Sequence, residues 1–465
     1  MKRSMQWLVG AVALWIACPV AAQPAPPDNK PDATLRSTPD TVVWGYFAAD
    51  IPPPLRIKSG QTVKIDTVSH GGVNTGVDPV TFFARNGIPA DQVLKDAIDI
   101  YEKVKRPRGA SAHILTGPIY IDEAEPGDML EVRMLAFEHR VPYGVNNSNR
   151  GTGVLPDLLT APAQKVIKFD LTRNVALFSD EIEVPLAPFM GIMAVAPSKE
   201  SWMISSRPPW RWGGNMDSKK LTAGSTLYLP VFHNGAQFFT GDSHAAQGDG
   251  EVNGTAIEAS LTPTLQFIVH KGGGKSMFWP RAEDATHYYA MGMDLDLNVA
   301  MKNAALETVA FLRDKKGLSA ADAYSLASIG VDFRVAEAVD AVQMVYGMIP
   351  KKLFKQTRNT GPKNDPAARL YRWSLRCRVG RARGDHPCRY PLRAWRRARS
   401  TRPHFGERPR QAAPRRQHHR REYRWCRRYR RHEYGRQGGA GWTHAAVQSV
   451  GKYRYQPLAA VQPAL

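Results

Sequence analysis

The most informative stretch of the chain is GDSHAAQGDGE, residues 241–251, which places one imidazole and three carboxylates within eleven residues. Asp242 and His244 are two positions apart, so on an extended strand their side chains point to the same face. Two further carboxylates, Asp249 and Glu251, follow Gly248. A glycine lets the backbone approach other groups closely. An apolar run at 227–232 precedes the stretch, which is unusual for a solvated acidic loop. We interpret the stretch as a site that holds a divalent metal ion or orients a proton-transfer pair.

A second motif lies just upstream, at Trp210–Asp217. Its paired glycines expose backbone N–H groups, and Asn215 and Asp217 have the spacing that puts two side chains on one face of an extended segment. An asparagine amide donates hydrogen bonds to an oxygen that gains charge, and an aspartate binds metal ions. The indoles of Trp210 and Trp212 are expected to line a pocket. A turn with a capping Asn or Asp is the alternative interpretation.

Three further residues are weaker candidates. Glu258 follows Glu251 by seven residues, so the two point to opposite faces of a regular strand and converge only if Gly254 marks a bulge. His70 follows an expected strand at a glycine-rich turn, where functional residues often collect, but a single histidine is as often structural. His113 is explained at least as well as a strand-edge residue.

Short alternating or apolar runs between Gly, Pro and Asp predict a mainly β chain. The expected architecture is a β-sandwich or barrel with a few helices rather than repeated βαβ units. Asp78-Pro79 is expected to form a turn. About 310 residues, from about Thr41 to Phe354, can bury a substantial core, expected to be divided over two β-rich subdomains. The expected strands are 62–68, 129–135, 164–169, 225–232 and 265–269, and the expected helices are 90–105, 294–312 and 319–326.

The first residues predict export. Lys2 and Arg3 precede an apolar segment at 7–18 that is too short to span a membrane. Small residues at 20–22 stand where a signal peptidase reads the chain. We therefore expect a signal peptide over 1–22, a disordered leader over 23–40, and a secreted or periplasmic protein that is not inserted in a membrane. Lipoprotein processing at Cys18 is the alternative.

The positive charge of the chain belongs to its last hundred residues. Residues 366–465 carry 25 Arg and 1 Lys against 4 acidic residues, a balance of +22 that leaves about −1 for residues 1–365. An arm that binds nucleic acid would not exclude lysine so completely. We interpret residues 355–465 as a linker and a disordered Arg-rich tail that arises from a frameshift, with no nucleic-acid partner. An Arg-rich anion-binding arm is the alternative.

Cysteine chemistry is excluded from the body of the protein. The four cysteines lie in the leader and the tail, at Cys18, Cys377, Cys388 and Cys426. Neither a disulfide nor a thiolate nucleophile can therefore contribute to the function of residues 41–354.

Taken together, these motifs resemble the acetamidase/formamidase family over about Thr41 to Phe354. The resemblance implies a β-rich fold, a homo-oligomer and the hydrolysis of short linear amides to carboxylate and ammonia. The Trp210-Arg211-Trp212 segment departs from many relatives, and the leader with the Ser69-His70-Gly71 turn is similar to a secreted branch of the family. The matching pieces are 116–120, 125–128, 188–191, 213–217, 229–231, 241–258, 331–334 and 349–351.

These residues are consistent with a metal-activated water that attacks an amide carbonyl. Glu251 would take the proton of the water and later deliver one to the leaving nitrogen. Asn215 or nearby backbone N–H groups would stabilise the oxyanion. A non-catalytic periplasmic protein that binds a small polar ligand is the alternative. The candidates are therefore Asp217, Asp242 and His244 as ligands of zinc or a similar divalent ion, with Glu251, Asn215 and Glu258 as catalytic residues.

Overall fold

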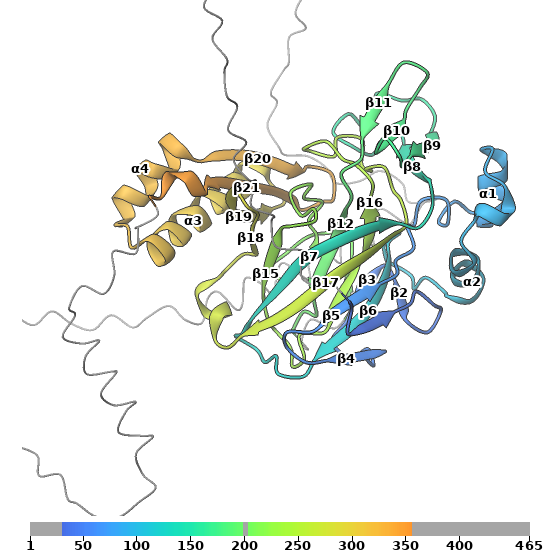
Figure 1. Ribbon diagram of the computed structural model, residues 1–465. Coiled ribbons are helices and arrows are strands. Elements are labelled where there is room, and N and C mark those ends of the chain that lie inside the picture. The colour runs from blue at the N-terminus through green and yellow to red at the C-terminus, as the bar shows by residue number, and fades with distance from the viewer. Residues whose placement is uncertain (1–29, 199–202, 356–465) are drawn as a thin grey trace, which may run out of the picture. The chain divides into compact units, whose positions relative to one another are not determined.

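Two β-sheets make up most of the computed structural model, which describes residues 30–198 and 203–355 (Figure 1). The mainly β architecture expected from the sequence is confirmed. These residues fall into one compact unit rather than two subdomains, because strands from both halves of the chain alternate within one sheet. The expected signal peptide and Arg-rich tail lie outside the described residues.

The larger sheet has nine strands, which are antiparallel except for the pair β1 and β5. Residues 30–40 were expected to belong to the disordered leader, but they contain β1. Leu35 is buried, and the Asp32 carboxylate accepts a 2.7 Å hydrogen bond from the Thr62 N–H. In spatial order the strands are β1 (Ala33–Leu35), β5 (Thr62–Ile65), β17 (Leu261–His270), β7 (Met129–His139), β15 (Thr226–Pro230), β18 (Arg281–Glu283), β19 (His287–Asp294), β21 (Gln343–Pro350) and β20 (Asp332–Glu337).

The second sheet packs against the first and contains the most deeply buried strands. The rings of Phe238 and Phe267, one from each sheet, lie 4.9 Å apart, so the two sheets form a sandwich. Every residue of β12 and β16 is buried. The strands are β14 (Gly213–Asn215), β12 (Phe189–Val195), β16 (Phe238–His244), β6 (Ile114–Ile121), β2 (Val42–Trp44) and β4 (Leu55–Ile57), with β3 (Tyr46–Phe47) and β13 (Ile204–Ser205) paired separately.

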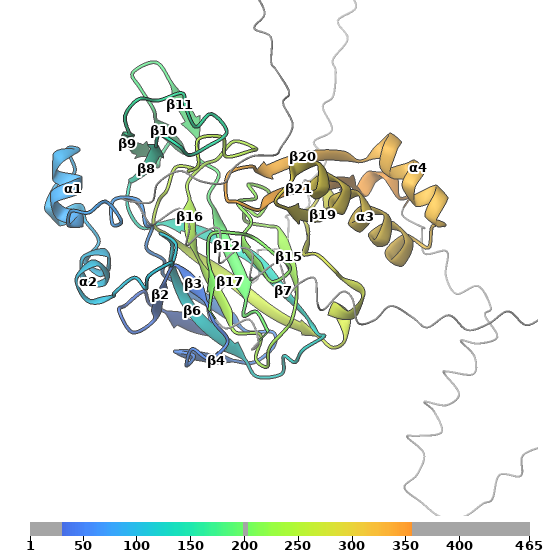
Figure 2. The same cartoon turned by 180° about the vertical axis from the view of Figure 1, so that it is seen from behind.

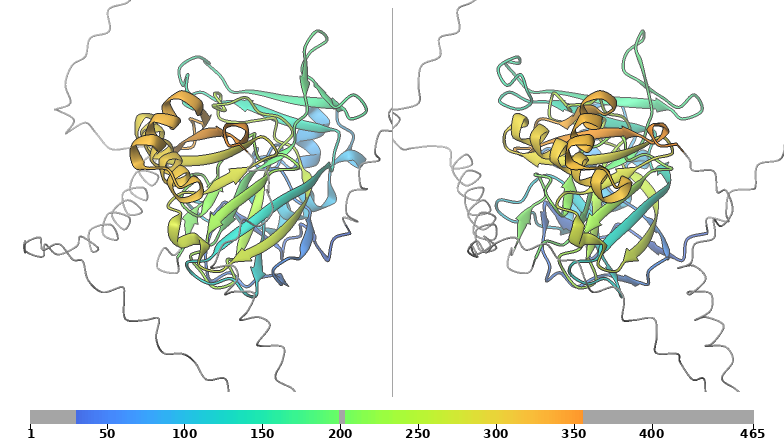
Figure 3. Two further views of the ribbon diagram at one scale, coloured as in Figure 1. Left: turned by 60° about the vertical axis from the view of Figure 1, so that its left-hand side comes forward. Right: turned by 90° about the vertical axis from the view of Figure 1, so that its left-hand side faces the viewer.

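A four-stranded arm, residues 143–186, projects from one end of the sandwich (Figures 1, 2 and 3). Ile167 and Ala176 of the arm pack with Ala245 and Ile257, which flank the loop after β16. This contact places the arm beside the motif at 241–251. Its strands are β8 (Tyr143–Ser148), β9 (Ala163–Asp170), β10 (Val175–Leu177) and β11 (Glu183–Pro185).

The described residues contain four α-helices, which lie at the two ends of the sandwich (Figure 1). The first was expected to be a turn, but Asp78 accepts a hydrogen bond from the Thr81 N–H and Pro79 occupies the first turn, an arrangement that starts a helix. No helix in the described part of the chain is long and apolar enough to cross a membrane. The helices are α1 (Pro79–Arg85), α2 (Lys95–Lys103), α3 (Leu297–Lys316) and α4 (Ala320–Gly330), with 3₁₀ turns at Ala90–Gln92, Gly273–Ser276 and Lys351–Leu353.

Candidate metal centre

The end of β16 carries the first two residues of the site. Asp242 and His244 are both buried, and His244 Nε2 lies 3.5 Å from Asp242 Oδ2. The two side chains therefore converge, as their spacing predicts. The backbone is not the extended strand assumed from the sequence, because Asp242 has a left-handed φ of 53°.

Asp217 and Glu251 approach the same histidine from two loops. Asp217 Oδ1 lies 3.9 Å from His244 Nδ1, and donor atoms of Asp217, His244 and Glu251 all lie within 4.8 Å of one another. Asp217 and Glu251 also have left-handed φ values, of 41° and 45°. Such strain costs about 1–3 kcal/mol per residue and concentrates at functional sites. Three of the seven non-glycine residues with positive φ in the described ranges belong to this cluster.

Glu258 belongs to the cluster although the sequence made it a weak candidate. Its Oε1 lies 3.4 Å from His244 Nε2, and it forms a second group of possible metal ligands with Asp242 and His244. The expectation of opposite faces was wrong because residues 251–258 form turns rather than a regular strand, with a φ of 95° at Gly254.

His70 and His113, whose roles the sequence left open, complete the cluster. Their rings lie 5.2 Å apart in an edge-to-face arrangement. His70 Nδ1 is 3.3 Å from Asp242 Oδ1, and His113 Nε2 is 3.9 Å from Asp242 Oδ2. These three residues form a third group of possible ligands.

Sequence reasoning missed three further residues of the site, which are Gln247, Glu337 and Asp340. Asn215 donates a 2.6 Å hydrogen bond from its amide to Asp340, which sits beside the buried Glu337. Gln247 lies 3.0 Å from His244 Nδ1 through its Oε1 and donates to the Asp217 carbonyl oxygen through its Nε2. Only Gln247 carried a signal, because it lies inside the motif at 241–251.

Asp249 and the two indoles of the second motif lie outside the groups of possible metal ligands. The Asp249 carboxylate interacts with Lys219, Arg334 and Tyr346 rather than with the cluster. Trp210 packs edge-on against Trp279, and Trp212 is buried. Neither indole is among the residues that line the two cavities described beside the cluster, so a pocket lined by these indoles stays a prediction.

The crowding of buried carboxylates raises the pKa of Asp217 and of Glu251. Burial, with the charges of Glu251 and Asp242, raises the pKa of Asp217 well above its usual range. Burial also raises the pKa of Glu251, as do Asp340 and neighbouring acidic groups. These carboxylates therefore retain protons to a higher pH than they would in water, unless a cation compensates them.

The pKa values of His70 and His244 are raised although burial alone would lower them, whereas burial lowers the pKa of His113. Burial lowers the pKa of His244, but Glu258 and Asp242 outweigh it and raise that pKa well above its usual range. Burial raises the pKa of Asp242, yet His113 and His244 together hold it well below its usual range. The cluster thus couples anionic and cationic groups in a space that excludes water.

Several oxygen and nitrogen atoms of the cluster have no hydrogen-bond partner in the described structure, although they are buried. Buried polar atoms are nearly always satisfied, so these atoms indicate a group that they jointly hold. Carboxylate oxygens and imidazole nitrogens are ligands that suit zinc and similar divalent ions. The residues therefore fit a divalent metal ion. The unpaired atoms are His70 Nδ1, Asn215 Oδ1, both Asp217 carboxylate oxygens, Asp242 Oδ1, His244 Nε2 and Glu258 Oε2.

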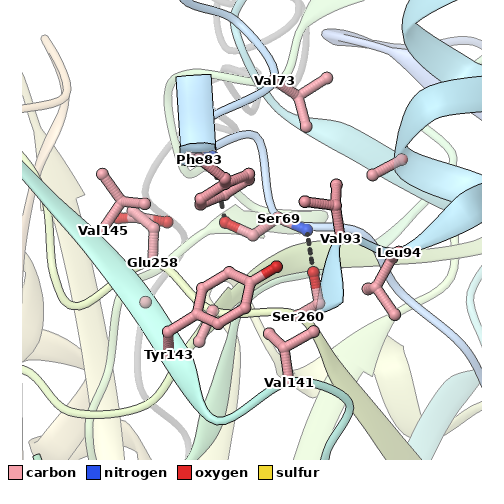
Figure 4. A pocket seen from close by; sticks show the side chains of 14 residues that line it. Ser69, Val73, Phe83, Val93, Leu94, Val141, Tyr143, Val145, Glu258 and Ser260 are labelled. Carbon is pink, nitrogen blue, oxygen red and sulfur yellow. Dashed lines mark hydrogen bonds between the residues drawn. The ribbon is translucent and has the colours of Figure 1, made fainter. Parts of the chain in front are cut away.

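Two cavities adjoin this cluster from different sides. One, of about 20 Å³, adjoins Glu258 and is enclosed mainly by apolar side chains such as Phe83 (Figure 4). The other, of about 540 Å³, is lined by Glu251 and Gln247 on the side of the arm.

Comparison with known proteins gives one consistent result. A sequence model described as the Acetamidase/Formamidase family matches residues 89–207 and 204–356. A protein of Schizosaccharomyces pombe named as a formamidase is 27% identical over 283 residues, which cover 48% of this chain and 63% of that protein. The chain thus spans less than two thirds of the length of that relative.

Two other matches cover more of their own length. A formamidase of Methylophilus methylotrophus is 25% identical over 321 residues, which cover 52% of this chain and 77% of that protein. The crystal structure of an acetamidase from Bacillus halodurans superposes with a TM-score of 0.57 at 26% identity, covering 69% of this chain and 98% of that one.

Proposed function

Because the chain belongs to the acetamidase/formamidase family, we propose that it hydrolyses the C–N bond of linear primary amides, in the formamide and acetamide class, to a carboxylate and ammonia. Relatives named as formamidase and acetamidase support the reaction class. The observation that carries the proposal is the buried cluster around His244, with its unpaired carboxylate and imidazole atoms.

A divalent ion, which we propose to be zinc, would be held by His244 with Asp217 and Asp242, the ligands expected from the sequence. His70, His113 and Glu258 extend the available donors. When bound, such an ion polarises a carbonyl oxygen and lowers the pKa of water.

The side chains of the cluster supply the proton transfers. Attack of a water oxygen on the amide carbon releases a proton, which Glu251 takes on its carboxylate. Collapse of the tetrahedral intermediate breaks the C–N bond, and Glu251 returns the proton to the departing nitrogen, so that ammonia leaves. A general base works best when its pKa lies near the working pH, and the raised pKa of Glu251 favours this role. Glu258 is the second candidate for it.

Asn215 is proposed to stabilise the oxyanion. Its amide nitrogen carries two hydrogens, one of which is donated to Asp340. This hydrogen bond orients the amide and leaves one hydrogen for the developing charge. Removing one such donor from an enzyme typically lowers kcat by about 10²–10³-fold.

The cellular setting is also a proposal. The pattern of residues 1–22 favours export to the periplasm or the medium. The family resemblance favours a homo-oligomer. The substrate is proposed to be a small amide, with neither nucleic acid nor membrane as a partner.

The decisive experiment measures ammonia release from short amides by the purified full chain, with and without a chelator. Turnover that the chelator abolishes and a divalent ion restores is expected. Asp242→Ala and His244→Ala are expected to lose both bound metal and turnover. Asp249→Asn is the matched control, since this carboxylate of the same motif interacts with Lys219 rather than with the cluster.

Two results would contradict the proposal. If Asp242→Ala and His244→Ala kept their metal and activity, the assigned centre would be wrong. If the folded, metal-loaded protein released no ammonia from any amide, a non-catalytic binding protein would be the better interpretation.

A further inference from the structure

The larger of the two cavities at the cluster is far bigger than the smallest amides require. Its volume is about 540 Å³, which lies within the range of about 300–1,000 Å³ typical of sites for small organic molecules. The cavity lies between the arm and the loop that follows β16, and Glu251 forms part of its wall.

Apolar side chains dominate the part of this cavity that the arm contributes. Ile167 comes from β9 and Val184 from β11, while Phe178 lies between β10 and β11. Val252 and Ile257 complete the apolar wall from the opposite loop. Such a surface favours an aliphatic group, because burial of apolar area is stabilising, whereas a polar group buried without hydrogen bonds is destabilising.

The polar side chains of the same walls are engaged with one another. The Asn146 amide donates to the Thr255 hydroxyl and to the Ala256 carbonyl oxygen, and the Asn253 amide donates to Asn146. Lys219 is paired with the Asp249 carboxylate at 3.2 Å. These groups therefore offer a polar ligand few free partners along the walls.

The end of the cavity that faces the cluster differs from its walls, because it carries the Glu251 carboxylate. There it reaches Glu251 and Gln247, and Gln247 connects to His244 and Asp217. A ligand with one amide end and one apolar end would match this distribution. Its amide would face Glu251 and its chain would follow the arm.

On the proposed amide hydrolysis, we infer that the preferred substrates are primary amides with an unbranched apolar acyl group of several carbons, which occupies the cavity lined by Ile167, Phe178 and Val184. Formamide and acetamide would leave most of that cavity unfilled. The arm is thus the element that determines acyl specificity.

The small cavity at Glu258 cannot take such a chain. Its volume of about 20 Å³ corresponds to about one water molecule. Figure 4 shows Phe83, Val141 and Tyr143 around it, with Glu258 at one side. It provides the internal comparison for the test.

The test measures kcat/KM of the full chain for formamide, acetamide, butyramide and hexanamide. We expect a rise of about three- to fourfold for each added methylene, since each buried methylene contributes about 0.8 kcal/mol. Val184→Phe narrows the large cavity and is expected to lower the hexanamide-to-acetamide ratio at least tenfold. Val154→Phe, an exposed position on the same arm outside the cavity, is the matched control and should leave the ratio unchanged.

The ratio does not depend on the active fraction, so partial unfolding of a variant does not affect it. A flat chain-length profile with clear turnover would overturn the inference and leave the proposed function standing. So would a ratio that responds to Val141→Ala, in the small cavity, and not to Val184→Phe. No ammonia from any amide would instead overturn the proposed function, and the inference with it.

Discussion

Gly191 of β12 lies so close to Asp217 that a β-carbon on Gly191 would come within 2.4 Å of Asp217 Oδ1. That β-carbon would also lie 2.9 Å from Asp242 Oδ2 and 2.8 Å from the Asp242 carbonyl oxygen. The carboxylates of Asp217, in a loop, and Asp242, in β16, can therefore meet only because this position of the central strand has no side chain. Space, and not backbone conformation, requires the glycine here.

Gly191→Ala is accordingly expected to displace Asp217 and Asp242 and to abolish tight metal binding. Overpacking of this kind typically costs about 1–3 kcal/mol of stability, so the variant should still fold. Metal content after dialysis, with urea unfolding, measures both effects. Gly248→Ala is the control, because a β-carbon there meets no atom within 4 Å. Full metal retention in Gly191→Ala would contradict the assignment.

Gln247 is expected to act as a positioning residue for His244. Its side chain joins His244 Nδ1 to the Asp217 carbonyl oxygen, so it sets which imidazole nitrogen faces the centre. Loss of such a partner typically weakens metal binding about 10–100-fold. Gln247→Ala should show this loss in a chelator competition, and Gln247→Glu should recover part of it. Unchanged affinity in Gln247→Ala would show that the bond does not orient the ring.

Metal binding is expected to release protons. Burial and neighbouring carboxylates raise the pKa of Asp217 and Glu251. Burial lowers the pKa of His244, but Glu258 and Asp242 raise it more. All three groups therefore hold protons to higher pH in the metal-free protein, and a metal ion must displace them. Affinity should thus fall as the pH is lowered.

Calorimetric titration with zinc in buffers of different protonation enthalpy counts the released protons. The count should be smaller in Glu251→Gln, which cannot bind the proton that Glu251 holds. Heats that are the same in every buffer, with an affinity that does not change with pH, would contradict the raised pKa values.

A buried ion pair joins the large sheet to α3, away from the centre. Arg281 Nε donates a 2.6 Å hydrogen bond to Glu307 Oε1, and both side chains are about nine-tenths or more buried. Removing one partner leaves an uncompensated charge, so Glu307→Ala is expected to lower the free energy of unfolding by about 3–5 kcal/mol. Urea unfolding measures it. The double variant with Arg281→Met and Glu307→Leu should recover most of the lost free energy of unfolding. The metal content should not change in either variant.

Local patterns in the sequence anticipated the parts of the site that depend on nearby residues. The spacing of Asp242 and His244 correctly indicated that they meet, although the strand is not regular at Asp242. The same assumption of regularity misjudged Glu258, because turns replace the expected strand before it. Asp78-Pro79 suits a turn and a helix start equally well, so only the following contacts of α1 decided between them.

Distant residues of the site carried no local signal. Glu337 ends β20 and Asp340 follows it before β21, about a hundred residues beyond Asp242 along the chain. They reach the cluster because Glu337 pairs with Gly250 and Asp340 accepts from Asn215. Nothing in their own neighbourhood of the sequence distinguishes them from surface acids.

By itself, the sequence determined the β architecture, the absence of cysteine chemistry in the body of the protein, and the motif around Asp242 and His244. These depend on side-chain identity and on the two-residue period of a strand. Only the tertiary structure decided that His70, His113 and Glu258 join the cluster, that Gly191 makes room for it, and that an arm leaves an apolar cavity beside Glu251. Burial and proximity between distant segments arise from packing, which no local pattern records.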